Sequence, residues 1–150
     1  MATPHGPLVP FAHRDTFRVT YHDLDVLNHL NHATYFVYME TLRCRYYLTT
    51  VGNLDPQKLD IIIAEASCRY LAPATYDTEM IGEIAPARPL GTTSFALLYR
   101  FRDEEAKTIY ARGRTVVVSY DYARGTKKPI APDRRAMLER DAVDASLEGW

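Results

Sequence analysis

Residues 31–52 read NHATYFVYMETLRCRYYLTTVG, and this stretch decides the fold because it has the apolar spacing of one long helix. Asn31 is placed to cap its start and Gly52 to end it. At 100° per residue, the side chains that share one narrow polar stripe are Thr34, Tyr38, Thr41 and Arg45. Apolar side chains cover most of the remaining circumference, so we expect the rest of the chain to wrap around this helix.

Segments with the polar and apolar alternation of β-strands precede and follow the helix. They are residues 14–21, 59–73, 75–86, 92–103 and 107–121. Short connections such as ARPLG and DEEA favour antiparallel hairpins over parallel crossovers. The sequence therefore predicts an α+β domain in which a five-stranded antiparallel sheet curls around one long helix, with a short helical pattern after the prolines at 129 and 132.

Length and composition predict a single cytoplasmic domain over residues 1–150, with residues 1–12 as a loose N-terminal tail. The net charge of −1 gives no electrostatic reason to expect a nucleic acid or an anionic membrane as a partner. No apolar run reaches the roughly 20 residues of a membrane span. Cys44 and Cys68 are expected to be buried free thiols in a reducing compartment.

The expected sheet also predicts association of the chain with itself. One helix cannot cover both faces of such a sheet, and an exposed edge strand invites pairing with another chain. We therefore expect a homodimer, which could pair further into a homotetramer.

The titratable groups concentrate just before the helix, in the stretch YHDLDVLNHLNHATY at residues 21–35. Asp25 lies seven residues before His32, where the first backbone amides of the helix lack intrahelical partners. A carboxylate facing such amides suits acyl transfer, because the amides stabilise developing negative charge while the carboxylate attacks or activates water. From the residues alone, caps and turns are nevertheless the more common roles for Asp23 and Asp25.

Two other interpretations of charged residues stay open. The imidazoles of His22, His29 and His32 beside these carboxylates would suit zinc or iron, but no recognised ligand spacing is present, so we expect no metal. Glu40 and Arg43 lie three residues apart on the apolar part of the helix and are expected to form a structural ion pair. Glu40 could alternatively be a catalytic carboxylate.

The stretch YHDLDVLNHLNHATYFVYMETLR resembles the signature of the hotdog-fold acyl-CoA thioesterases, in their 4-hydroxybenzoyl-CoA thioesterase branch. Members of this branch carry an Asp-x-Asp, then Gly-His-Val-Asn, a Tyr that opens the helix and a Glu-x-x-Arg. The resemblance runs over roughly residues 14–133. It includes the stretches RYLAPATYDTEMIGEI, GTTSFALLYRF and ARGRTVVVSYDYARGTKKPIAP. It implies the hotdog fold.

The resemblance also assigns roles to residues. The catalytic aspartate falls on Asp25, and the backbone N–H that polarises the thioester carbonyl falls on His32. His29 and Asn31 match the His and Asn of the loop motif, and Tyr35 matches the aromatic residue that packs the first helical turn. These residues are therefore implied to form the substrate site.

Two departures from the family pattern concern substrate binding. Asn28 stands where relatives usually have glycine, which fits a backbone position with positive φ. Thr93, before Ser94 of the Thr-Ser-Phe strand, replaces a basic residue that some relatives use for nucleotide phosphates. The candidates for phosphate contacts here are Arg88, Arg124, Lys127 and Lys128.

The resemblance implies an enzyme that hydrolyses an acyl-CoA thioester to a free acid and coenzyme A. Coenzyme A belongs to the substrate, and no separate cofactor is expected. Asp25 would act as nucleophile or as general base. Two alternatives are a hydratase or dehydratase acting on enoyl or 3-hydroxyacyl thioesters, and a non-catalytic acyl-CoA binding protein.

Overall fold

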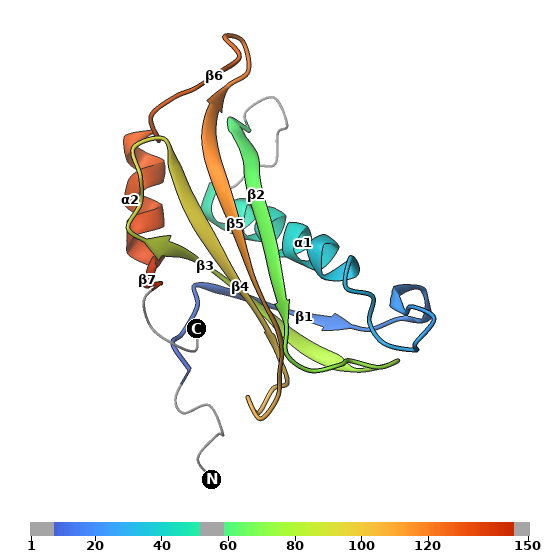
Figure 1. Cartoon of the computed structure of the whole chain (residues 1–150). Coiled ribbons are helices and arrows are strands. Elements are labelled where there is room, and N and C mark those ends of the chain that lie inside the picture. Colours follow the sequence, from blue (N-terminus) through green and yellow to red (C-terminus); the bar gives the residue numbers. More distant parts are fainter. Residues whose placement is uncertain (1–7, 52–58, 146–150) are drawn as a thin grey trace.

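A computed structural model describes residues 8–51 and 59–145 of the chain, and Figure 1 shows a sheet of strands with two helices. In chain order they are β1 (His13–Arg18), the 3-10 turn η1 (Tyr21–Asp23), α1 (Thr34–Val51), β2 (Ile61–Tyr70), β3 (Glu79–Arg88), β4 (Ser94–Arg102), β5 (Ile109–Asp121), β6 (Thr126–Lys127), α2 (Pro132–Asp141) and β7 (Val143–Asp144).

The main strands form one antiparallel sheet in the order β1-β3-β4-β5-β2. The predicted five-stranded sheet and its long helix are therefore confirmed. Two short strands extend it, since β6 pairs with β5 and β7 pairs in parallel with β3. Figure 1 shows α1 lying across one face of the sheet, with α2 beside the end of β3.

The core lies between α1 and the inner face of the sheet. Met39 and Leu42 of α1 are buried against alternate residues of the strands, such as Ile84 of β3 and Leu97 of β4. This alternation follows from the pleat, which sends successive side chains to opposite faces. The long helix and the strands thus bury each other's apolar sides.

The prediction that Tyr38 lies in a polar stripe of α1 is wrong. This side chain is only 8% exposed, and its ring stacks on Phe17 of β1 with the centroids 4.6 Å apart. Val37 is instead 57% exposed, and Phe36 and Leu48 also reach solvent. The reason is that the sheet of one chain covers α1 from one side and does not wrap it.

Gly82 of β3 lets α1 approach the sheet closely. A Cβ built at this position would lie 2.6 Å from the ring of Phe17 and 3.0 Å from Leu42. We expect Gly82→Ala to lower the free energy of unfolding by about 1–3 kcal/mol, because the rigid ring must move in a packed core. Urea unfolding measures this change, and an unaltered midpoint would show that the approach is not tight.

The predicted loose tail is wrong for residues 8–12, which lie on the sheet, whereas residues 1–7 lie outside the described part of the chain. The carbonyl of Val9 accepts a hydrogen bond from Nη2 of Arg100 at 2.8 Å. The guanidinium of the same arginine lies 4.3 Å from the ring centroid of Phe11. These contacts hold the segment before β1 against the sheet face that points away from α1.

A buried ion cluster lies on this same outer face. Glu83 of β3 accepts hydrogen bonds from Nε of Arg100 at 2.7 Å and from Nη2 of Arg102 at 2.9 Å. The three residues are 6%, 1% and 8% exposed, respectively. Burial alone would raise the pKa of Glu83, but the two arginines outweigh it and hold the pKa below its ordinary value.

Both cysteines are free, as predicted, but they are half-buried rather than buried. Burial raises the pKa of the Cys68 thiol to about 11, so this group stays protonated at neutral pH. Neither helix in the described part of the chain combines the length and apolar character of a membrane-spanning segment.

Candidate active site

Asp23 holds the turn that leads out of β1. Its Oδ2 accepts hydrogen bonds from the backbone N–H and the hydroxyl of Thr20, both at 2.8 Å, and from the Tyr38 hydroxyl at 3.0 Å. Burial raises the pKa of Asp23, but these hydrogen bonds outweigh it and keep the pKa low. Asp23 therefore has the structural role that its place in the sequence suggested.

The loop after this turn positions Asp25. Its Oδ1 accepts the backbone N–H of Leu27 at 2.8 Å and that of His29 at 3.4 Å, and its own N–H donates to the His29 carbonyl at 2.9 Å. Asn28 has φ of 60°, which is the left-handed conformation for which relatives usually carry glycine. Asparagine adopts this conformation more readily than most residues. The loop folds back on itself and leaves Oδ2 of Asp25 without a hydrogen-bond partner among the described residues.

Asn31 organises the entry into α1. Its Oδ1 accepts the Ala33 N–H at 2.9 Å and its carbonyl accepts the Thr34 N–H at 2.9 Å, so Asn31 forms the turn that leads into α1. Because α1 begins at Thr34, Asn31 lies ahead of the cap position that we predicted for it. The backbone N–H of His32, between Asn31 and Ala33, donates to no other described residue. The His32 carbonyl accepts the Tyr70 hydroxyl at 2.8 Å, which fixes this peptide against β2.

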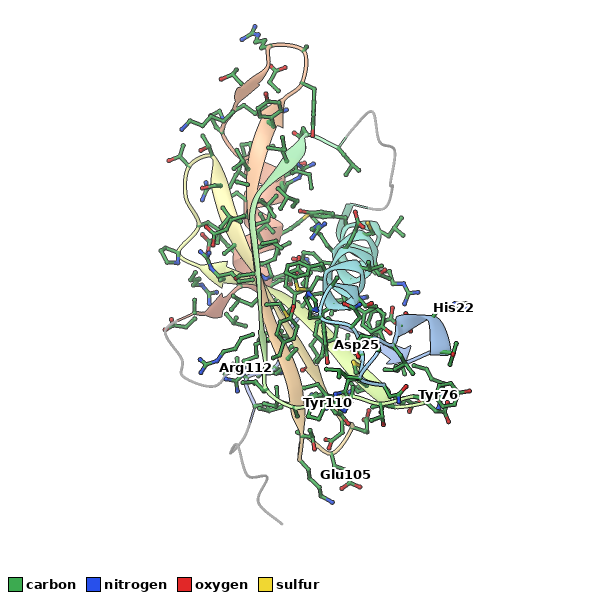
Figure 2. The ribbon with its side chains drawn as sticks, turned by 45° about the vertical axis from the view of Figure 1, so that its right-hand side comes forward. His22, Asp25, Tyr76, Glu105, Tyr110 and Arg112 are labelled. Carbon is green, nitrogen blue, oxygen red and sulfur yellow. The ribbon has the colours of Figure 1, made fainter. Side chains whose placement is uncertain are left out.

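These residues border one open cleft of about 360 Å³ between the loop, the start of α1 and the end of β2. Its lining consists of Asp25, His29, Leu30, His32, Tyr35, Tyr70, Leu71, Ala72, Pro73 and Ala74. The structure thus brings together four of the predicted site residues. Figure 2 shows Asp25 on the α1 side of the sheet, close to the first turn of the helix.

Aromatic rings form one wall of the cleft. Tyr35 is buried, with its ring centroid 5.5 Å from that of Tyr70 and 5.4 Å from that of Phe101. Burial raises the pKa of Tyr35 far above its ordinary value and that of Tyr70 to about 12. Both phenols are therefore neutral at physiological pH. Sequence reasoning missed Tyr70, because only its contact with His32, 38 residues away, reveals it.

The predicted phosphate contacts and the Thr-Ser-Phe residues do not reach this cleft within one chain. Arg88 donates to the carbonyls of Ala142 at 2.6 Å and Glu139 at 3.0 Å, so it holds the end of α2. β4 begins at Ser94, directly after Thr93, at the same end of the sheet. β3 begins at Glu79, beside the cleft, and its ten residues span about 30 Å. Arg88, at the other end of β3, therefore lies far from the cleft.

The basic residues near β6 also lie away from this cleft. Lys128 pairs with Asp60 at 2.8 Å, and Arg124 lies 3.8 Å from Asp121. Neither borders the cleft of Asp25. Lys127 lies in β6, which pairs with the far end of β5.

The ion pair predicted between Glu40 and Arg43 is wrong for the described chain, because neither side chain has an ion-pair partner there. Arg43 instead donates from Nη1 to the Tyr99 hydroxyl at 3.2 Å. Glu40 is exposed, and both residues border a second cavity of about 370 Å³ between α1 and β2. No three His, Cys, Asp or Glu side chains in residues 8–51 and 59–145 are grouped to hold a metal ion.

Comparison with known proteins places this geometry in a family. The family model of the thioesterase-like superfamily matches residues 19–139. None of the curated proteins matches the chain significantly. Among solved structures, a thioesterase from Thermus thermophilus, complexed with coenzyme A and Zn, is 25% identical, with a TM-score of 0.75 over 86% of this chain and 98% of its own.

Two further structures share the fold. A protein from Pseudomonas aeruginosa strain PAO1 is 25% identical, with a TM-score of 0.76 over 88% of this chain and 92% of its own. The gentisyl-coenzyme A thioesterase BH1999 is 21% identical, with a TM-score of 0.70 over 85% and 99% of the two chains. Since the family match spans most of the sequence and the fold agrees, this chain belongs to the thioesterase-like superfamily and is a thioester hydrolase.

Proposed function

We propose that the protein hydrolyses an acyl-CoA thioester to the free acid and coenzyme A in the cleft of Asp25. The observation that carries this proposal is the pairing of one carboxylate with one unengaged helix-start amide, that of His32, on the border of a single cleft. The coenzyme A bound to the Thermus thermophilus thioesterase supports this substrate class.

The proposed mechanism divides the work between these two groups. The thioester carbonyl oxygen would accept a hydrogen bond from the His32 N–H, where the helix dipole also favours negative charge. Oδ2 of Asp25 either attacks the carbonyl carbon, forming a mixed anhydride as the thiolate of coenzyme A departs, or takes a proton from the attacking water. In the first route, water then cleaves the anhydride and regenerates the carboxylate.

A panel of acyl-CoA substrates assayed for released thiol tests this function. Hydrolysis yields one free thiol per acid formed. A hydratase would instead consume the enoyl absorbance of crotonyl-CoA without releasing thiol. A binding protein would retain acyl-CoA unchanged. Absence of thiol release across aromatic, short, medium and long acyl groups would overturn the proposal.

We also propose that the chain forms a dimer through β2. This strand is an edge of the sheet, its free side pairs with no described strand, and eight of its ten residues are exposed. Ile62 and Ile63 leave 41% and 37% of their surface in water. Pairing with a second copy would satisfy the edge and cover these side chains.

This dimer would also supply what the single chain lacks. Two antiparallel β2 strands related by a two-fold axis place the Tyr70 end of one beside the Ile61 end of the other. In the strand register, Ser94 of β4 lies opposite Val118 of β5, and Val118 lies opposite Ile62 of β2. The start of β4 is therefore level with the Ile61 end of β2. Thr93 and Ser94 of a second copy would thereby approach the cleft of Asp25.

We expect the protein to sediment at twice the chain mass of 17.1 kDa. The double variant Ile62→Lys/Ile63→Lys should shift it toward the monomer, because like charges would face each other across the paired edges. Tyr76→Lys, at a side chain 63% exposed on the turn before β3, is the matched control and should leave the mass unchanged. A wild-type protein that sediments as a monomer at micromolar concentration would contradict the β2 dimer.

A further inference from the structure

Arginines line up across the outer face of the sheet, on the side away from α1. The strand register places Arg69 of β2 opposite Arg112 of β5, and Arg112 opposite Arg100 of β4. Arg100 in turn lies opposite Glu83 of β3. Directly opposed residues have their Cβ atoms about 4.5–5.5 Å apart, a distance at which like charges destabilise a sheet. Three adjacent guanidinium groups in one row therefore need counter-charges.

The chain itself supplies few of them. Glu83 is shared between Arg100 and Arg102. Within residues 8–51 and 59–145, neither Arg69 nor Arg112 has a carboxylate at ion-pair distance. Nε of Arg112 is buried and lacks an acceptor among these residues. The middle of the row thus carries positive charge and an unused donor.

A cavity lies over this part of the row. It has a volume of about 310 Å³, and its lining consists of Ser67, Cys68, Arg69, Arg112, Gly113 and Arg114. Among the described residues, the three arginines of this cavity have one ion pair, between Nη1 of the exposed Arg114 and Oε1 of Glu65 at 3.5 Å. Three arginines against one glutamate leave the cavity with a net positive charge. Figure 2 shows Arg112 on the opposite side of β2 and β5 from Asp25.

We propose that Arg69, Arg112 and Arg114 form a binding site for a phosphorylated small molecule, on the outer face of the sheet and separate from the thioesterase cleft. Planar guanidinium groups bind phosphate oxygens through paired hydrogen bonds, and a phosphate group can engage several of them at once. Burial, followed by repulsion from Arg100 and Arg69, lowers the pKa of Arg112, and a bound anion would relieve that repulsion. The site is built within one chain and does not depend on the proposed catalytic activity.

The first probe is inorganic pyrophosphate, and calorimetry at constant ionic strength measures its binding. We expect saturable binding to the full chain that falls at least tenfold in Arg112→Gln and in Arg69→Gln. Arg14→Gln is the matched control, because this exposed arginine lies on the same outer face and pairs with Glu104. It should bind pyrophosphate like the wild type. Equal losses in all three variants, or no saturable binding, would overturn the site.

A second experiment distinguishes two sources of the phosphate group, an independent phosphorylated molecule and coenzyme A itself. If the ligand is an independent phosphorylated molecule, coenzyme A should not displace pyrophosphate, and Arg112→Gln should leave the KM for acyl-CoA unchanged. Displacement by coenzyme A together with a raised KM would mean that the arginines hold the substrate's own nucleotide, which would overturn a separate site. Thermal unfolding of each variant checks that the protein is folded, and Arg69→Gln, at an exposed position, keeps the test valid if Arg112→Gln is unstable.

Discussion

Asp25→Asn should lower kcat for acyl-CoA hydrolysis by about 10²–10⁴, the usual contribution of a positioned carboxylate acting on a reacting group. The amide cannot serve as nucleophile or base. Its Oδ1 can still accept the N–H groups of Leu27 and His29, so the loop should keep its shape. The free energy of unfolding should therefore change by less than about 0.5 kcal/mol. Thiol release and urea unfolding measure the two effects.

Asp77→Asn is the matched control for this variant. Asp77 also lies on a loop, has φ of 64° and forms an exposed ion pair with Arg18 at 3.0 Å. Asparagine tolerates this backbone conformation, and exposed pairs contribute little. The control should hydrolyse substrate at the wild-type rate. A loss of less than tenfold in Asp25→Asn would remove the catalytic role from this carboxylate.

The second large effect concerns stability. We expect Glu83→Gln to lower the free energy of unfolding by about 3–5 kcal/mol, because it leaves Arg100 and Arg102 buried without their counter-charge. Glu79→Gln is the control on the same strand. Glu79 pairs with Arg18 at 2.7 Å, but both side chains are 55% exposed, so its loss should cost less than about 1 kcal/mol. Equal effects of the two substitutions on the urea midpoint would contradict this assignment.

The same carboxylate gives a pH dependence with a definite sign. The pKa of Glu83 in the folded protein lies below its ordinary value of 4.5. Its contribution to stability is thus complete above pH 4.5 and is lost as the pH falls from there through the folded pKa. The difference in unfolding free energy between wild type and Glu83→Gln should shrink over that acidic range. A difference that stays constant down to the acid unfolding transition would contradict it.

Much of the fold was predictable because its signals are local. The helical period of residues 31–52 and the alternation in the strand segments depend on near neighbours, and the structure has α1 and the five main strands in those places. The left-handed Asn28 and the turn formed by Asn31 are local as well, since each acts within a few residues of chain. Asp25 and His32 reach the cleft through this same loop.

Other features could not be predicted, because they depend on residues far apart in the sequence. Tyr38 faces the core because Phe17 lies across from it, and Tyr70 enters the cleft through a hydrogen bond to His32. Arg88, predicted for substrate phosphates, holds α2 instead. Each outcome depends on which strand lies next to which.

The sequence by itself determined the elements, the loop that carries Asp25 and the thioesterase-like family, because short-range periodicity and a contiguous signature encode them. The tertiary structure alone decided which charges meet. Strand register places Arg69, Arg112 and Arg100 in one row and gives Glu83 to two arginines at once. Register is set by the packing of whole strands against α1 and against each other, so no single stretch of the chain contains it.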